Sequence, residues 1–242
     1  MFYDSVIQKY GDKMKKRLRA ADIFGTSILF AIIAAAFVLS YFLTKLCLFG
    51  REYFTPHTFI DDLVPLWTPS VVVYVLAYVQ WIFCLVAIVF QDREHKYRSV
   101  SAIMYAILIS AVIFIVLPTN TVRPEITGNS IFDRLLKLIY LSDTPVNVLP
   151  SFHCMASWIV SRCLAADSKT PRWVNALNFT FTLLVFASVL LTKQHLFLDI
   201  PAAILVAEIA LLISKRFVYT RLLDRILNYK IGNNCSGGKE TK

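Results

Sequence analysis

Long apolar blocks, separated by short polar stretches, dominate the chain. Three of these blocks contain no charged residue: 23–44, 71–90 and 99–117. Three later blocks are shorter or carry polar residues: 151–166, 173–192 and 196–214. A helix needs about 20 apolar residues to cross the hydrocarbon core of a bilayer, and backbone polar groups inside lipid must be bonded internally. The pattern therefore predicts an all-α fold, a polytopic membrane helix bundle with six transmembrane helices.

Composition and charge support a membrane protein and predict its orientation. Of the 242 residues, 57% are hydrophobic and 17% are charged, against about 45–50% and about 25% in soluble domains. With six spans, most of the 25 Lys and Arg residues fall on one side of the membrane. The other side holds Lys45, Arg51, Arg123, Arg134, Lys137 and Lys193. By the positive-inside rule we expect both termini in the cytoplasm. The net charge of +9 could suggest a nucleic-acid partner, but its one-sided distribution is a signal of membrane topology, so no nucleic acid is expected.

Three parts are expected along the chain. Residues 1–20 form a basic cytoplasmic lead-in, 21–216 a six-helix membrane domain, and 217–242 a basic, partly disordered cytoplasmic tail. The longest polar stretch, 118–150, lies on the outer side, and its apolar spacing predicts a short surface helix over 131–141. The first apolar block is too long for a cleavable signal, so we expect it to remain as a span.

Ionisable residues in or beside spans are costly, so each is a candidate for function. The predicted topology brings four of them to the outer surface: Arg123, His153, His195 and Asp199. If His195 and Asp199 begin one helix, their i, i+4 spacing places both side chains on one face. The carboxylate can then fix the imidazole tautomer and stabilise its positive charge. The alternative is a hydrogen-bonded pair that only stabilises a helix end.

Residues before and beside these candidates suit an anion. Pro150 and Ser151 predict the start of a helix, because proline cannot continue a preceding helix and serine is a favoured N-cap. The free N–H groups of that helix would bind a phosphate next to His153. Arg123 could hold phosphate oxygens in pairs, and Lys193 could add charge. The alternatives are a capped helix with an incidental histidine, and interfacial Arg and Lys side chains that reach toward headgroups.

Together these residues resemble the type-2 phosphatidic acid phosphatase superfamily. Pro150-Ser-Phe-His153 is similar to its Pro-Ser-x-His motif, His195-Leu-Phe-Leu-Asp199 to its His-x-x-x-Asp motif, and Arg123-Pro124 to its first Arg-Pro motif. Where other members have Lys and Arg, this chain has Val116 and Val189. These departures are typical of a divergent branch that includes inositol phosphorylceramide and sphingomyelin synthases and many bacterial lipid phosphatases. In the bacterial members the place of Asn147 helps to line the pocket.

The resemblance implies a mechanism. His195, oriented by Asp199, would attack a lipid phosphate to form a phosphohistidine, and His153 would act as general acid and then as general base. Arg123, Lys193 and the N–H groups after Ser151 would stabilise the phosphoryl oxygens. No carboxylate cluster for a two-metal site is evident, so neither metal nor cofactor is expected.

The predicted function is hydrolysis of a lipid phosphate monoester or diphosphate, of the phosphatidic acid or isoprenyl diphosphate type. The protein would be a multi-pass protein of a plasma or inner membrane, with its active site on the non-cytoplasmic face. One alternative is a headgroup phosphotransferase that uses the same site. A second alternative is a non-enzymatic lipid transporter, although transporter sites usually lie near the midplane. The sequence assigns no role to Glu208, His57 or His95 and gives no oligomeric state.

Overall fold

The computed structural model describes residues 50–217 and, before them, residues 31, 33, 35, 36, 38–40 and 44. Within this described part the chain is helical, and its extended pairing is confined to two isolated bridges, Phe54 with Thr119 and Asn120 with Val146. The predicted all-α class is confirmed. The predicted lead-in and most of the first span and of the tail lie outside the described residues.

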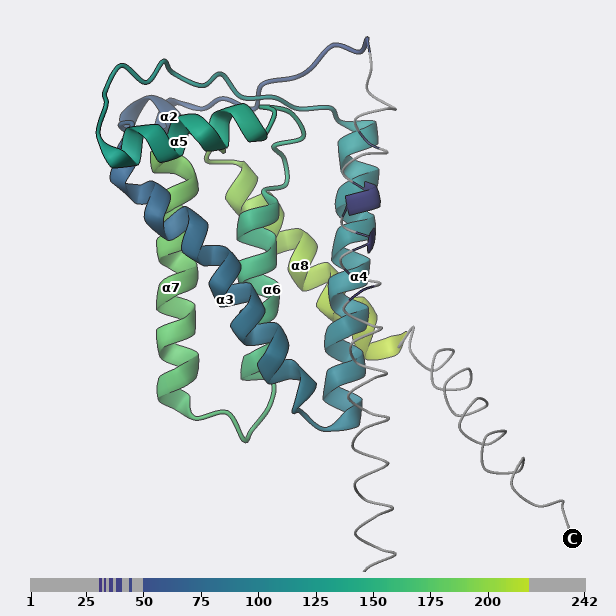
Figure 1. The fold of residues 1–242 in the computed structure, drawn as a ribbon. Helices are drawn as coiled ribbons and strands as arrows, with labels where there is room; N and C mark the ends of the chain where they lie inside the picture. The colour runs from purple at the N-terminus through teal and green to yellow at the C-terminus, as the bar shows by residue number, and fades with distance from the viewer. Residues whose placement is uncertain are drawn as a thin grey trace, which may run out of the picture.

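Five helices run along the length of the bundle (Figure 1). They are α3 (Val71–Val89), α4 (Arg93–Val116), α6 (Phe152–Ala165), α7 (Arg172–Leu191) and α8 (Asp199–Arg216). Three shorter elements lie across one end: α2 (Phe59–Leu63), the 3-10 turn η1 (Thr68–Ser70) and α5 (Ile131–Ser142). The helix predicted over 131–141 is therefore present as α5.

The connections decide which helix ends meet. Short links at 90–92 and 166–171 join α3 to α4 and α6 to α7 at one end of the bundle. The longer connection 117–151, which contains α5, and the turn 192–198 lie at the opposite end. The first turns of α3, α6 and α8 therefore share the end that α5 covers.

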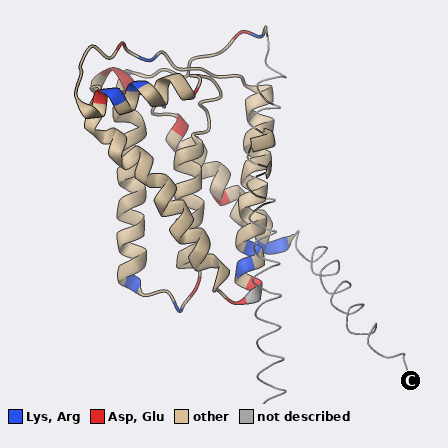
Figure 2. Cartoon of the chain, viewed as in Figure 1, with Lys and Arg blue, Asp and Glu red and all other residues tan. Residues whose placement is uncertain are grey.

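Three of the described helices are long and apolar enough to cross a membrane: Thr68–Val89, Glu94–Val116 and Arg172–Leu191. Their outer faces expose large apolar side chains, such as Val79 at 58% and Leu183 at 60%, as expected of helices that face lipid. Figure 2 shows that charged residues gather toward the two ends of the bundle. The six-span count and the side of the termini remain predictions.

The predicted blocks 151–166 and 196–214 correspond to α6 and α8. Helix α6 has 14 residues, fewer than a perpendicular crossing needs. Helix α8 begins at Asp199 rather than at residue 196, because the residues before it form a turn. It also carries Glu208 within its length and Lys215 and Arg216 in its last turn.

Small residues allow α4 and α8 to pack closely. Ala102 and Ala106 on α4, and Ala203, Ala207 and Ala210 on α8, are fully buried. Helices in lipid gain little from hydrophobic burial against each other, so close backbone approach at small residues supplies much of their packing energy. The side chains at these positions therefore limit how near the two helices can lie.

Enlarging one of these alanines should destabilise the bundle. Ala207→Leu adds volume to a filled contact, and we expect it to lower the free energy of unfolding by about 1–3 kcal/mol. Thermal unfolding in detergent micelles measures the change. Ala187→Leu is the control, because Ala187 is exposed on α7. Equal stability of the two variants would contradict close packing at Ala207.

Candidate functional site

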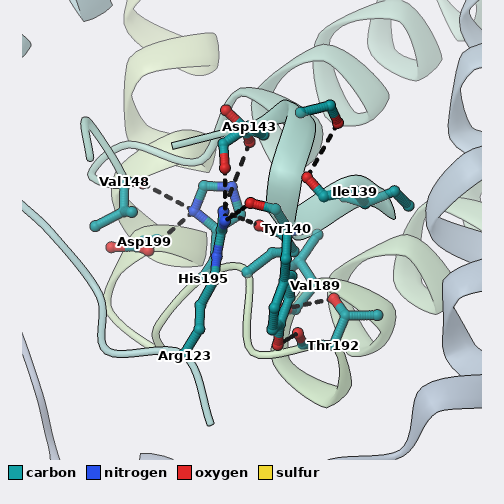
Figure 3. A network of polar contacts seen from close by, with 11 residues as sticks. Arg123, Ile139, Tyr140, Asp143, Val148, Val189, Thr192, His195 and Asp199 are labelled. Atoms are coloured by element: carbon teal, nitrogen blue, oxygen red, sulfur yellow. Dashed lines mark hydrogen bonds and ion pairs between the residues drawn. The ribbon is translucent and has the colours of Figure 1, made fainter. Parts of the chain in front are cut away.

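His195 lies in the turn just before α8, and its ring is held from one side. Its Nδ1 is 3.1 Å from Asp199 Oδ2 and 3.0 Å from the carbonyl oxygen of Val148 (Figure 3). Both partners only accept hydrogen bonds, so Nδ1 carries the proton and Nε2 of the neutral ring keeps its lone pair. This is the tautomer that a nucleophilic Nε2 requires.

Asp199 orients His195 differently from the way the spacing predicted. The two residues were expected to share a helix face, but α8 begins at Asp199 and His195 precedes it. Asp199 Oδ2 also accepts the Leu196 N–H at 2.8 Å, which folds the turn back over the start of α8. The pair is therefore formed by a turn around a fully buried carboxylate, and the prediction of a shared helix was wrong.

His153 occupies the first turn of α6, as the sequence predicted. Ser151 is the N-cap, and its Oγ accepts the Cys154 N–H at 3.3 Å. The His153 ring is only 9% exposed, and its Nε2 has no hydrogen-bond partner among the described residues. The centroids of the His153 and His195 rings are 6.4 Å apart, so an atom between them can reach both.

Three aromatic rings of α3 surround His153. Tyr74 stacks on it with centroids 4.0 Å apart, and Trp81 and Tyr78 lie at 5.1 and 5.4 Å. Trp81 Nε1 in turn donates to Ser157 Oγ on α6 at 2.8 Å. The imidazole is therefore fixed by stacking rather than by a hydrogen bond, and its nitrogen stays available to a ligand.

The guanidinium of Arg123 sits at the end of α5. Nη1 donates to the carbonyl oxygens of Asp143 at 2.7 Å and Tyr140 at 3.3 Å, and Nη2 donates to Gln194 Oε1. The Asp143 carboxylate lies 3.8 Å from Nη2, and the Tyr140 ring lies 4.7 Å from the guanidinium carbon. A cation is favoured at the negative end of a helix dipole, so α5 positions this charge.

Tyr140 also ties α5 to the turn that carries His195. Its hydroxyl donates to the Thr192 carbonyl at 2.6 Å (Figure 3). Burial raises the pKa of Tyr140 to about 12, so the phenol remains a neutral donor at physiological pH. The link between α5 and the His195 turn is therefore kept across the working pH range.

These side chains surround one cavity of about 210 Å³. Its lining includes Arg123, Asp143, Asn147, His153, Gln194 and His195. They come from the connection 117–151, the first turn of α6 and the turn 192–198, which meet at the α5 end of the bundle. The cavity therefore presents two imidazoles and one guanidinium to the same small volume, which suits a tetrahedral phosphoryl group.

Not every predicted residue reaches the cavity. Lys193 points elsewhere: its Nζ donates to the carbonyl oxygens of Asp61, at 2.8 Å, and Val64. Ser151 is fully buried as the cap of α6, and its N–H donates to the carbonyl oxygen of Asp199 at 3.3 Å. The expectation that Lys193 adds charge to the site is therefore corrected, because nearby carbonyls take its ammonium group.

Asn147 does line the cavity, in a left-handed backbone conformation with φ of 58°. Its Nδ2 donates to Thr44 Oγ1 at 3.2 Å, which brings the described helical position 44 close to the site. Val116 and Val189, which stand where other family members have Lys and Arg, supply no charge. Val116 is exposed, and Val189 is buried as part of the core.

Sequence reasoning missed several residues of the site. Gln194 and Asp143 hold Arg123, and Tyr74, Tyr78 and Trp81 surround His153. The aromatic residues follow a spacing of i, i+4, i+7, a readable helical signal that is also typical of plain core packing. For Gln194 the sequence contained no signal other than its position next to His195. Among the residues that the structure describes, no group of three or more His, Cys, Asp or Glu side chains could hold a metal ion.

The sequence model described as the PAP2 superfamily matches residues 48–213, which contain every described residue of the cavity lining. The chain belongs to the PAP2 superfamily. The predicted resemblance to the type-2 phosphatidic acid phosphatases is thereby confirmed. A search of curated proteins and a search of solved structures found no match. Membership of the PAP2 superfamily indicates phosphatase-type activity on phosphate esters.

The aromatic rings around His153 should matter for turnover in this PAP2 protein. Trp81→Leu removes one ring and its bond to Ser157, so the imidazole should lose its fixed orientation. We expect turnover of a phosphate ester to fall on the order of ten-fold, since small misplacements of a reacting group are costly. Steady-state kinetics measure this. Trp173→Leu, at an exposed position on α7, is the control; equal losses in both variants would contradict this role.

Proposed function

We propose that the protein is an integral-membrane lipid phosphate phosphatase that works through a phosphohistidine intermediate. The observation that carries the proposal is the single cavity lined by His153, His195 and Arg123, with His195 already in the tautomer of a nucleophile. Substrates would be lipid phosphate monoesters or diphosphates, of the phosphatidic acid or isoprenyl diphosphate type.

In the first step His195 Nε2 attacks phosphorus, and the P–O bond to the lipid breaks as the P–N bond forms. His153 donates a proton to the departing alkoxide. In the second step His153 takes a proton from water, the water oxygen attacks phosphorus, and the P–N bond breaks to release phosphate. Asp199 stabilises the positive charge on His195, and Arg123 stabilises charge on the phosphoryl oxygens.

An apolar cavity supports a lipid as the substrate. It has a volume of about 510 Å³ and lies between α3, α4 and α6, with Ile33 and Val38 of the preceding segment also in its lining. Tyr78 and Phe152 line both this cavity and the polar one. A molecule with a phosphate at one end and a hydrocarbon chain at the other fits this arrangement: the phosphate would occupy the polar cavity and the chain the apolar one.

The charge distribution supports an active site on the non-cytoplasmic face. The end of the bundle opposite the cavity carries most of the described basic residues, including Lys96, Arg98, Arg162, Lys169 and Arg172 (Figure 2). By the positive-inside rule that end faces the cytoplasm. We therefore propose a multi-pass protein with six spans and cytoplasmic termini, located in a plasma or inner membrane.

A headgroup phosphotransferase is the second candidate, and one observation favours it. Among the residues that line the polar cavity, Arg123 is the single Lys or Arg, and Asp143 lies beside it. A phosphodiester carries one negative charge and needs one cation, whereas a fully ionised monoester carries two. In the second step a lipid or inositol hydroxyl would then attack phosphorus in place of water. A non-enzymatic transporter receives no such support.

Replacing either histidine should abolish phosphate release. Full-length protein in detergent micelles is incubated with a panel of lipid phosphates in the presence of a chelator. We expect His195→Ala and His153→Ala each to lower the rate by at least about a hundred-fold, as general acid–base groups contribute on that order. His57→Ala is the matched control, because His57 lies outside the cavity beside Asp62.

The products separate the alternatives. Retained activity in both cavity variants would refute the proposed site. Formation of a new headgroup lipid without phosphate release would favour the transferase instead.

Filling the apolar cavity should alter the preference for chain length. Ala156 lines that cavity on α6, and Ala156→Phe would occupy part of it. We expect the KM for a long-chain lipid phosphate to rise several-fold, since a buried CH₂ contributes about 0.8 kcal/mol, while hydrolysis of a short water-soluble phosphate ester is kept. Ala187→Phe, on the exposed face of α7, is the control. Equal effects on both substrates would argue against a tail in this cavity.

A further inference from the structure

Few positively charged side chains line the polar cavity. Arg123 is its single guanidinium or ammonium group among the described lining residues, and the Asp143 carboxylate lies 3.8 Å away. Lys193 donates to backbone carbonyls outside the cavity. Among the described lining residues the formal charges of Arg123 and Asp143 offset each other, so these residues add no net positive charge before a histidine is protonated.

Gln194 is an uncharged side chain in the lining, close to Arg123 and His195. Its side chain is 2% exposed and lines the cavity next to His195. Arginine can only donate, so the amide atom that faces Arg123 is the oxygen, Oε1. The amide nitrogen Nε2 is left on the other side, and it has no hydrogen-bond partner among the described residues.

A buried donor without a partner is unfavourable, and a ligand that supplies an acceptor relieves this cost. A phosphoryl oxygen is the acceptor that best fits this cavity, because the same lining contains Arg123, His153 and His195. His153 Nε2 is a second buried nitrogen without a partner among the described residues. Both nitrogens belong to residues that line one volume. The amide nitrogen can only donate, and the imidazole nitrogen donates when it carries a proton, so a phosphoryl oxygen can accept from both when the cavity is filled.

We propose that Gln194 binds the phosphoryl group through its amide N–H and that the cavity is built for a phosphoryl group with a single negative charge. The proposal rests on the proposed function of the cavity and adds the charge class of its substrate. A neutral amide contributes a hydrogen bond without balancing a second negative charge. A second negative charge on the ligand would be repelled by the Asp143 carboxylate, and the positive charge of Arg123 is already partly balanced by that carboxylate.

Two substrates have this chemistry. A phosphate diester carries one charge at every physiological pH, and a monoester carries one charge when it is protonated once, with a second pKa of about 6. The first source leads to a headgroup-transfer or diesterase reaction, and the second to a phosphatase that prefers acidic conditions.

Binding of two non-hydrolysable lipid analogues tests the proposal without relying on turnover. Isothermal titration of the full chain in detergent micelles compares dodecylphosphonic acid with its monomethyl ester, at about pH 9 and about pH 5.5. At the higher pH the acid carries two charges and the ester one. We expect the wild type to bind the ester at least several-fold more tightly than the acid at the higher pH.

The lower pH tests whether charge alone explains the preference. We expect the acid, which then carries one charge, to bind about as tightly as the ester, so that a protonated monoester is accepted as well as a diester. An acid that remains weak at the lower pH would show that the cavity does not select by charge and would overturn the proposal.

Variants of Gln194 isolate the amide. Gln194→Glu keeps an oxygen for Arg123 but removes the donor, and Gln194→Met removes the donor without adding charge. Each should weaken binding of the ester by about ten- to a hundred-fold, as a hydrogen bond to a charged group is worth that much. Gln194→Lys adds the missing cation and should reverse the preference toward the doubly charged acid. Melting temperatures in micelles establish that each variant is folded.

Lys193→Gln is the matched control, since it removes a positive charge one residue away. We expect it to bind both analogues as the wild type does. Loss of binding in this variant, unchanged binding in the three Gln194 variants, or a wild-type preference for the doubly charged acid would each overturn the proposal. Absence of binding of either analogue to the wild type would overturn the phosphate-binding cavity itself and the proposed function with it.

Discussion

The buried carboxylate of Asp199 is the contact on which the α5 end of the bundle depends. Its Oδ2 accepts from His195 Nδ1 and from the Leu196 N–H, and its carbonyl oxygen accepts the Ser151 N–H. One residue therefore begins α8, fixes the His195 ring and joins the start of α8 to the start of α6. A carboxylate at 0% exposure needs donors, and here both of them bind Oδ2, whereas Oδ1 has no hydrogen-bond partner among the described residues. The two histidines reach one cavity because their helices are joined at this point.

Helix α5 completes the site from above. It lies across the end of the bundle (Figure 1), its last carbonyl groups hold Arg123, and Tyr140 bonds to Thr192 in the turn before His195. The same segment thus supplies the cation and restrains the nucleophile. Below this layer the contacts become apolar, and the cavity between α3, α4 and α6 continues from Tyr78 and Phe152. A polar layer over an apolar one matches the two parts of an amphiphilic ligand.

The hydrophobic pattern was sufficient to predict the helical class, the long helices α3, α4 and α7, and the surface helix α5. Capping preference and the spacing of ionisable residues indicated His153, which follows the cap Ser151, and the pairing of His195 with Asp199. These features depend on local spacing: apolar periodicity reports burial, and capping and i, i+4 contacts join residues that are close in sequence. The start of α8 was wrong by several residues, because a turn with its own hydrogen bonds replaced the first turn of the expected helix.

By itself, therefore, the sequence determined which residues are chemically able to act and roughly which end of the bundle they occupy. Only the tertiary structure decided which of them meet. Lys193 binds the carbonyl oxygen of Asp61, 132 positions away, and Gln194 binds Arg123, 71 positions away. Long polar side chains choose among partners that the folded chain brings near, and no local pattern specifies that choice. For this reason Lys193, which was expected in the site, lies outside it, and Gln194, which was not expected there, lines the cavity.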